Sequence, residues 1–393
     1  MIKKAVLIVL MLCAGCFTCS CSSAENSFAE TSGHEVSKQE NSVIPSTEQR
    51  TTAVSSEELN ERKIDNMIVD MTLEEKIGQM FYVRCPDTDA VEIISEYNPG
   101  GYILFGRDFD GKTRDDIISD IKGYQDASKI PMLIGTDEEG GSVVRVSSNP
   151  ALRESPFLSP SDTYAKGGWN AIINDASEKA DLLLSLGINV NMAPVCDITS
   201  DPDAFMYYRS FSPDVDMANR FVKTVVEISS DKKLGTVLKH FPGYGNNTDT
   251  HTGIAYDSRD YSDFEGIDFK PFKEGIKSGA DCILVAHNIV DCMDSEYPAS
   301  LSQKVHSIIR SELSFNGVIM TDDLSMDAIT EYTGSEAAAV FAAKNGNDIL
   351  CCTDVNVQYP AVLNAVQSGE IGEEQVNQSV KRILKWKQKL GLI

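Results

Sequence analysis

From residue 71 onward, the sequence repeats one pattern: a short apolar run ends in polar or glycine-rich residues, and an amphipathic stretch follows. The apolar runs predict eight strands, over residues 80–83, 101–105, 132–135, 188–195, 236–238, 282–286, 317–320 and 348–352. The stretches between them predict helices, among them residues 113–128, 170–186, 216–233, 261–278, 302–313, 334–345 and 358–368. Thr72 and Glu75 have the spacing of a capping box, which predicts a helix that begins after Thr72.

This alternation places the chain in the α/β class. Strands that are apolar on both faces and alternate with helices form parallel sheets. Eight such units predict a single (β/α)8 barrel of the TIM type over residues 57–393. An open, doubly wound sheet is the alternative, although no G-x-G-x-x-G follows any of the predicted strands to mark a nucleotide site.

Residues 1–21 have the features of a bacterial signal peptide. Lys3 and Lys4 form a basic start, and residues 5–12 form an apolar stretch that is too short to span a bilayer. The segment that ends in Cys16 resembles a lipobox, which implies cleavage before Cys16 and lipidation of that residue. Cys21 is a second candidate for lipidation, and a signal peptide without a lipid is the alternative.

Residues 22–56 are rich in Ser, Thr, Glu and Asn and have almost no apolar periodicity, which predicts a flexible, disordered linker. A lipid and a linker together predict an extracytoplasmic protein that is anchored to the bacterial cell membrane. The net charge of −24 argues against a nucleic-acid partner and against direct binding to an anionic bilayer. We expect a monomer.

Six cysteines lie outside the predicted leader. They form no C-x-x-C pair and no regular framework, and Cys282, Cys351 and Cys352 fall in predicted strands. These features predict buried free thiols rather than disulfides.

Polar side chains gather where the predicted strands end. The active sites of (β/α)8 barrels form at the carboxyl ends of the strands, which share one rim. The strand ends therefore predict a concave polar site, to which these residues contribute: Arg107, Asp108, Asp137, Asp197, Lys239, His240, His287, Asp322, Asp323 and Asp354.

One loop at this rim carries a second signal. Residues 239–251 follow a predicted strand, contain Gly243 and Gly245, and end in Asp249 and His251 with one residue between them. A carboxylate can orient a nearby imidazole and stabilise its charged form, so the two residues predict a proton-transfer pair. A solvated polar loop is the alternative for a pattern this short.

These motifs together resemble those of glycoside hydrolase family 3, in its β-N-acetylhexosaminidase branch. The resemblance extends over residues 59–392. It rests on MTLEEKIGQM (71–80), TDEEGG (136–141) with Arg145, NMAPVCD (191–197), YRSF (208–211), KHFPGYGNNTDTH (239–251), AH (286–287), PASLS (298–302) and MTDDLSM (320–326).

The resemblance implies a role for nine residues. Asp322 is the expected nucleophile, and Asp249 with His251 is the expected acid/base. Five residues correspond to positions that hold the sugar, and His287 lies near them on the next strand; the five are Asp137, Arg145, Arg209, Lys239 and His240.

The chain departs from the family pattern at three places. Tyr244 stands where histidine is common, and the segment between Gly245 and Asp249 is one residue shorter than usual. Glu138 stands where glutamine is frequent, which predicts altered contacts at the far end of the sugar.

The resemblance implies a retaining exo-β-N-acetylglucosaminidase without a cofactor or a metal. Its substrate would be a carbohydrate with a terminal β-linked N-acetyl-D-hexosamine, and we expect peptidoglycan fragments. A retaining mechanism needs a nucleophilic carboxylate and a proton donor, and Asp322 and His251 would supply them.

Four alternatives remain from the sequence. The first is a family 3 β-glucosidase or β-xylosidase, and the second is phosphorolysis, because a histidine acid/base does not repel phosphate. The third is a metal-dependent hydrolase, for which no ligand spacing such as H-E-x-x-H is present. The fourth is a sugar-binding surface lipoprotein, which would need neither Asp322 nor the Asp249–His251 pair.

Overall fold

The computed structural model describes residues 55–247, 249–250 and 253–393. The predicted leader with Cys16 and Cys21 lies outside the described residues, as does nearly all of the predicted linker. His251 lies outside them as well.

Eight parallel strands form one barrel sheet. They are β1 (Phe81–Arg84), β2 (Gly101–Leu104), β3 (Leu133–Thr136), β4 (Val190–Asn191), β5 (Gly235–Phe241), β7 (Cys282–Val285), β9 (Val318–Thr321) and β10 (Leu350–Cys352). The strands follow one another around the sheet in chain order, with β10 paired to β1. A parallel bridge between Met320 and Ile349 joins the β9 and β10 sides. The predicted (β/α)8 barrel is confirmed, each of the eight predicted strands is present, and the open doubly wound sheet is wrong.

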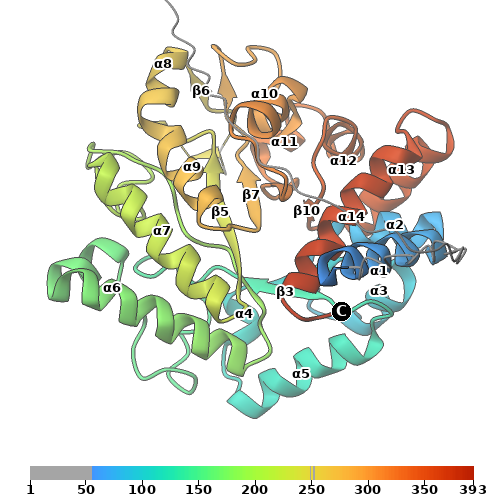
Figure 1. Ribbon diagram of the computed structural model, residues 1–393, viewed down its shortest axis with the longest axis horizontal. Coiled ribbons are helices and arrows are strands. Elements are labelled where there is room, and N and C mark those ends of the chain that lie inside the picture. The colour runs from blue at the N-terminus through green and yellow to red at the C-terminus, as the bar shows by residue number, and fades with distance from the viewer. Residues whose placement is uncertain (1–54, 248, 251–252) are drawn as a thin grey trace, which may run out of the picture. The chain divides into compact units, whose positions relative to one another are not determined.

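Helices surround the strands (Figure 1). The longer ones are α1 (Ser56–Asp70), α2 (Leu73–Gln79), α3 (Ala90–Tyr97), α5 (Arg114–Ala127), α6 (Pro160–Ser185), α7 (Val215–Asp231), α9 (Phe269–Lys277), α12 (Ser335–Lys344), α13 (Val355–Gln367) and α14 (Glu373–Lys389). All seven predicted helical segments contain helix, and α2 begins at the predicted capping box, where the Thr72 and Glu75 side chains each accept the other's backbone N–H. The first and last helices, α1 and α14, lie side by side (Figure 1).

Several short helices and turns lie between these longer elements. They are α4 (Gly106–Phe109), α8 (Tyr261–Asp263), α10 (Gln303–Ser307), α11 (Asp327–Thr330), the 3-10 turn Ala299–Leu301 and the π-helical turns Phe264–Asp268 and Ile308–Glu312. The strands β6 (Tyr256–Asp257) and β8 (Ile289–Val290) pair with each other outside the barrel. No described helix combines the length and the apolar character that a membrane crossing would need.

One large side chain fills the barrel interior opposite two glycines. Tyr82 on β1 is almost fully buried. A Cβ atom at Gly135 on β3 would lie 1.8 Å from the Tyr82 hydroxyl, and one at Gly101 on β2 would lie 2.6 Å from the Tyr82 ring. The two glycines therefore make the space that this tyrosine occupies, which closes the barrel beneath its carboxyl rim.

The thiols also lie where the sequence predicts them. The six described cysteines are unpaired, which confirms the prediction of free thiols. Cys292 is exposed and the others are buried: Cys85, Cys196, Cys282, Cys351 and Cys352.

A buried lysine lies at the amino end of β1. Lys387 on α14 is fully buried, and its Nζ donates to Gln79 Oε1 at 2.6 Å. Gln79 is a neutral acceptor, and burial lowers the pKa of Lys387 to about 7 from an ordinary value of 10.5. The unfolded chain therefore binds more protons than the folded chain between these two values, so this residue makes stability rise with pH across that window.

We expect Lys387→Met to raise the free energy of unfolding near pH 7 by an amount on the order of a few kcal/mol, because methionine needs no charge to be desolvated. The gain should shrink as the pH rises from about 7 toward 10.5, because the parent lysine is neutral in both states only above 10.5. Urea unfolding at several pH values measures it. Lys385→Met is the control, because Lys385 lies on the same helix with a half-exposed side chain. A gain that does not change with pH would contradict the expectation.

Candidate active site

A cavity of about 790 Å³ opens at the carboxyl ends of the strands. Its wall includes residues from the ends of β1, β2, β3, β5, β9 and β10. Eight of the residues predicted for the site line it: Asp137, Arg145, Arg209, Lys239, His240, Asp249, Asp322 and Asp323. The fold thus brings together, at one rim, residues that are up to 185 positions apart in the chain (322 minus 137).

Asp322 follows β9 directly. Its backbone N–H donates to the carbonyl oxygen of Val285 on β7 at 3.0 Å, so the ladder between the two strands continues to this residue. Its Oδ1 accepts the N–H of Asp323 at 2.9 Å. A side chain held on the scaffold in this way is placed more accurately than one on a free loop.

Asp323, which the strand ends also predict for the site, lies on the cavity wall. Its Oδ1 accepts the N–H of Ser325 at 2.9 Å, and its Oδ2 accepts the hydroxyl of Thr353 at 2.8 Å. Both carboxylate oxygens therefore tie the turn after β9 to the end of β10.

A buried ion cluster forms one wall of the cavity. Lys239 on β5 places its Nζ 2.6 Å from Asp137 Oδ1 and 2.6 Å from Glu139 Oε1. Arg209 donates to both oxygens of the same Glu139, from Nε at 2.9 Å and from Nη2 at 2.7 Å. Such a two-point contact fixes the plane of the guanidinium as well as its position.

The charges in the cluster shift the pKa values of its members. Burial alone would raise the pKa of Glu139, but Lys239 and Arg209 beside it hold that pKa well below its usual range. Burial alone would lower the pKa of Lys239, but Asp137 and Glu139 raise it above its ordinary value. Glu139, Lys239 and Arg209 therefore stay ionised near neutral pH, and these three charges keep a fixed pattern at the cavity wall.

His240 is fixed through both ring nitrogens. Its Nδ1 is 2.8 Å from Asp197 Oδ2, and Arg209 Nη2 is 3.2 Å from its Nε2. Because arginine only donates hydrogen bonds, Nε2 is the acceptor, and the proton of a neutral ring is on Nδ1, facing Asp197. Asp197 therefore holds the tautomer and orientation of His240 and is itself 3 % exposed.

Tyr244 connects Asp197 to the segment that carries Asp249. Its backbone N–H donates to Asp197 Oδ1 at 2.8 Å, and its hydroxyl is 2.6 Å from the Oγ1 of Thr250. Burial and the charge of Asp322 raise the pKa of Tyr244 far above its usual range, so the hydroxyl keeps its proton. Tyr244 and Thr250 are both almost fully buried, and Thr250 is the neighbour of Asp249 in the chain.

His287 takes a different place from the other predicted residues. It is fully buried; its Nδ1 is 2.7 Å from the Ser300 hydroxyl and its Nε2 is 2.9 Å from the carbonyl oxygen of Asp323. A carbonyl accepts only, so Nε2 carries a proton and donates to it. These contacts hold the backbone directly after Asp322.

Glu138 is bonded to the segment that carries Arg145. Its carboxylate is fully buried and accepts the backbone N–H groups of Arg145 at 3.0 Å and Val146 at 2.7 Å, and also bonds Ser147. A glutamate accepts with both oxygens, whereas a glutamine amide would turn a donor toward these N–H groups or lose one acceptor. Glu138 thus places the backbone of Arg145, and its predicted effect on contacts at the far end of the sugar stays a prediction.

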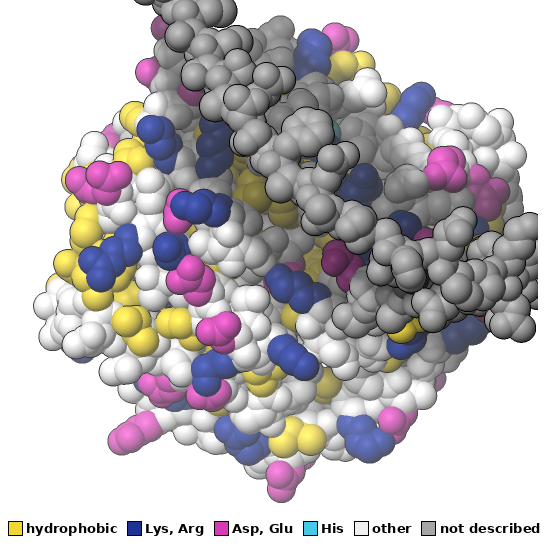
Figure 2. Space-filling model, viewed as in Figure 1, with side chains coloured by type: hydrophobic (Ala, Val, Ile, Leu, Met, Phe, Trp, Pro, Cys, Tyr) yellow, Lys and Arg dark blue, Asp and Glu magenta, His cyan; other side chains and the backbone are white. Residues whose placement is uncertain are grey.

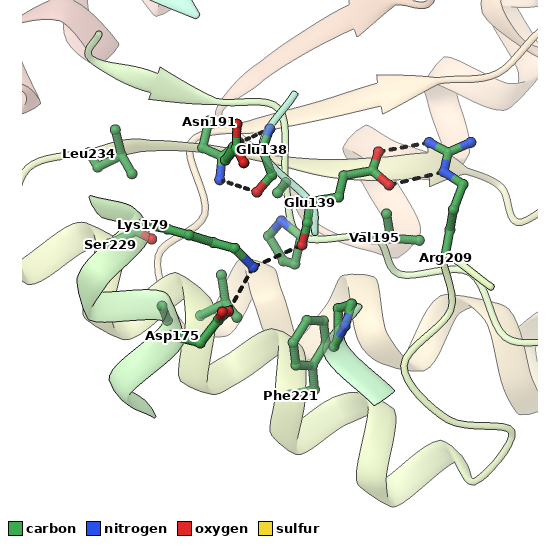
Figure 3. A pocket seen from close by; sticks show the side chains of 15 residues that line it. Glu138, Glu139, Asp175, Lys179, Asn191, Val195, Arg209, Phe221, Ser229 and Leu234 are labelled. Carbon is green, nitrogen blue, oxygen red and sulfur yellow. Dashed lines mark hydrogen bonds and ion pairs between the residues drawn. The ribbon is translucent and has the colours of Figure 1, made fainter. Parts of the chain in front are cut away.

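Glu139 is the site residue that the sequence analysis missed. Figure 3 shows its carboxylate facing the guanidinium of Arg209 beside a small enclosed cavity of about 30 Å³. In the same view Lys179 on α6 lies between Asp175 and the carbonyl oxygen of Glu139, to which its Nζ donates at 2.6 and 2.9 Å. The available signal was its position two residues after Asp137, in a run of three acidic residues at a strand end.

Two further observations describe the surroundings of the site. Within the described residues, no group of three or more His, Cys, Asp or Glu side chains has the arrangement of a metal site. On the face drawn in Figure 2, basic and acidic side chains are interspersed.

The sequence matches one known family over most of its length. Residues 72–386 match the model of the N-terminal domain of glycosyl hydrolase family 3. The chain belongs to this family. The match covers all eight strands of the barrel and every described residue of the cavity wall.

Several relatives of this family member are named β-hexosaminidase. It is 32% identical to Beta-hexosaminidase A of Pseudoalteromonas piscicida over 76% of this chain and 55% of the relative. It is 29% identical to Beta-hexosaminidase LpqI of Mycobacterium tuberculosis, over 79% of this chain and 81% of the relative.

A solved structure agrees with the barrel. A glycoside hydrolase family 3 β-N-acetylglucosaminidase from Paenibacillus sp. str. FPU-7 superposes with a TM-score of 0.77 at 29% identity, over 82% of this chain and 63% of that one. The chain therefore spans little more than half the length of some of the relatives that it matches.

We expect Tyr244→Phe to lower kcat for a chromogenic β-N-acetylglucosaminide by about tenfold, with a smaller change in KM, because the segment that carries Asp249 loses the bond to Thr250. The buried Thr250 hydroxyl also loses a partner, which should cost about 1–3 kcal/mol of stability. Steady-state kinetics and urea unfolding measure the two effects. Tyr261→Phe is the matched control, because its hydroxyl bonds the exposed Glu312. Parent-like kcat in Tyr244→Phe would show that the hydroxyl does not position the segment that carries Asp249.

Proposed function

We propose that this protein is a retaining exo-β-N-acetylglucosaminidase that removes terminal β-linked N-acetyl-D-hexosamine, with peptidoglycan fragments as its substrates. The observation that carries the proposal is that one cavity is lined by two sets of residues. Asp322 and Asp249 line it, and so does the ion cluster of Asp137, Lys239 and Arg209. Relatives named β-hexosaminidase support the choice of an amino sugar over a neutral glucoside.

In the proposed reaction, Asp322 is the nucleophile. Its carboxylate forms a bond to the anomeric carbon while the bond from that carbon to the leaving oxygen breaks, which gives a covalent glycosyl-enzyme. Water then attacks the same carbon and releases Asp322, so two inversions yield net retention. The position of Asp322 at a strand end suits this task, because a small displacement of a nucleophile is costly.

The leaving oxygen needs a proton, and we propose that the Asp249–His251 pair supplies it. Asp249 lies on the cavity wall, and His251 follows two residues later, outside the described residues. An imidazole with an ordinary pKa of about 6.5 can donate and take back a proton near neutral pH. Asp249 would favour the charged imidazole, and the same pair would then activate the water in the second step.

We propose that the ion cluster binds the hydroxyl groups of the sugar. Asp137 can accept hydrogen bonds, and Arg145, Arg209 and Lys239 can donate them. Asp137 keeps 15 % of its side chain exposed even though it pairs with Lys239, so an oxygen of it remains within reach of a ligand. Because these groups are already ordered, little conformational entropy is lost when the sugar binds.

The first test is hydrolysis of 4-nitrophenyl N-acetyl-β-D-glucosaminide by residues 56–393, beside Asp322→Asn and His251→Ala. We expect turnover by the parent and a loss of at least about a thousandfold in Asp322→Asn, because an amide cannot form the glycosyl-enzyme. His251→Ala should lose less with this activated leaving group than with a disaccharide, which depends more on a proton donor.

Four outcomes would contradict the proposal. Parent-like activity in Asp322→Asn would reject the nucleophile, and equal losses of His251→Ala on both substrates would reject the acid role. Glucosides cleaved in preference to N-acetylglucosaminides would reject the proposed sugar. A sugar phosphate formed in millimolar phosphate would replace hydrolysis by phosphorolysis.

We also propose that the protein is an extracytoplasmic lipoprotein, anchored at the bacterial membrane through Cys16, with Cys21 as the second candidate. The basic and apolar start of the chain, followed by a cysteine after small residues, supports this. Mass spectrometry of the mature protein should find an acylated cysteine at its N-terminus, and Cys16→Ala should release the protein from the membrane fraction. A mature N-terminus without an acyl group would reject the anchor.

A further inference from the structure

Arg84 lies where two cavities meet. It is the last residue of β1, and its half-buried side chain lines the catalytic cavity. The same side chain lines a neighbouring cavity of about 290 Å³, together with Asp87, Arg107 and Thr353. The guanidinium is therefore placed beside the proposed sugar site, at the edge toward β1 and β10.

Arg84 differs from most other arginines of this chain because it has no carboxylate partner. Arg209, Arg259 and Arg310 each pair with buried carboxylates. Among the described residues, none forms an ion pair or a hydrogen bond with the Arg84 side chain, and its Nε is buried without a partner. An arginine costs free energy when it is withdrawn from water without compensation, so an unpaired one beside a catalytic cavity points to a ligand.

The guanidinium is nevertheless held in place. It packs over the ring of Phe105, with Cζ 4.5 Å from the ring centroid. Arg145 packs on the same ring at 5.7 Å, and its Nε is also buried without a partner. Stacking orients the plane of a guanidinium but leaves the N–H groups at its edge available.

Asp87 is the one carboxylate among the described residues that line the neighbouring cavity. Arg107 in the neighbouring cavity pairs with Asp87 at 2.7 Å, so that carboxylate is occupied. The neutral hydroxyls of an N-acetylhexosamine do not supply a charge. A planar oxyanion matches the fork of a guanidinium with two parallel hydrogen bonds.

We propose that Arg84 is a specificity-determining residue that binds a carboxylate carried by the glycoside substrate. This inference rests on the proposed glycosidase function and assigns to Arg84 the recognition of an acidic substituent. A carboxylic ether on the second sugar of a disaccharide is one such substituent. Inorganic phosphate offers the same oxyanion chemistry, and the experiment separates the two sources.

The test compares two substrates that differ only in charge. One is a β-linked disaccharide of N-acetylglucosamine whose second ring carries a lactyl ether carboxylate, and the other is its methyl ester. We expect Arg84→Gln to lower kcat/KM for the acid by about 10- to 100-fold, the value of a charged hydrogen bond. The ester should change by less than about twofold. Arg84→Lys keeps the charge but loses the planar fork, so its loss on the acid should be intermediate.

Arg114→Gln is the matched control, because Arg114 bonds Ser185 on the outer surface. It should leave kcat/KM for both substrates unchanged. Circular dichroism and thermal unfolding establish that each variant is folded, and Arg84→Lys keeps the proposal testable if Arg84→Gln does not fold.

Two results would overturn the inference. Equal losses on the acid and on its ester would show that Arg84 does not read the carboxylate. Phosphate that changes the parent rate and not the Arg84→Gln rate, with the acid and ester turned over alike by the parent, would assign the guanidinium to free phosphate. Failure of the parent to cleave either substrate, or the chromogenic glycoside, would instead count against the proposed function itself.

Discussion

The site depends on one buried interaction, the contact of Glu139 with both Arg209 and Lys239. It ties together three parts of the rim: the segment after β3, the segment after β4, and β5. Each partner is buried and would cost several kcal/mol as an unpaired charge, so none can be removed without leaving the others uncompensated. Such a cluster adds little to the free energy of unfolding, because the cost of desolvating the charges offsets most of their attraction. Its main effect is to fix the positions of its side chains. Its contribution is a fixed arrangement of charge at the cavity wall.

From this cluster, hydrogen bonds continue without a break to the far side of the cavity. Arg209 reaches His240, His240 reaches Asp197, and Asp197 accepts the N–H of Tyr244, whose hydroxyl meets Thr250. Residues proposed to hold the sugar are thereby linked to the segment proposed to move protons. Tyr244 contributes the last two of these bonds, at a position where the family pattern commonly has histidine. The longer reach of a phenol offers a physical account of how a loop shortened by one residue can still be held.

Much of this architecture could be predicted from the sequence, and the reasons are local. Strands such as 282–286 are apolar on both faces, which only a sheet covered by helices can accommodate, and the polar residues after them then share one rim. Asp137, Lys239, His240 and Asp322 were predictable because each stands at a strand end. Glu138 and Glu139 were not, because side chains in a turn do not alternate as they do in a strand. Their directions are set by Val146 and Arg209, which lie elsewhere in the chain. That Arg84 has no carboxylate partner among the described residues could not be predicted either, because the sequence does not show which side chains lie beside it in the fold.

The packing of Tyr82 against Gly135 and Gly101 has a consequence for the order of events in the proposed reaction. Tyr82 closes the barrel below the cavity, so the cavity has no exit through the centre of the barrel. A sugar bound against Asp322 can leave only after the aglycone in front of it has gone, which makes release sequential. In the proposed reaction the released amino sugar would be the innermost product and would leave last, so it would compete with the next substrate molecule for the empty pocket.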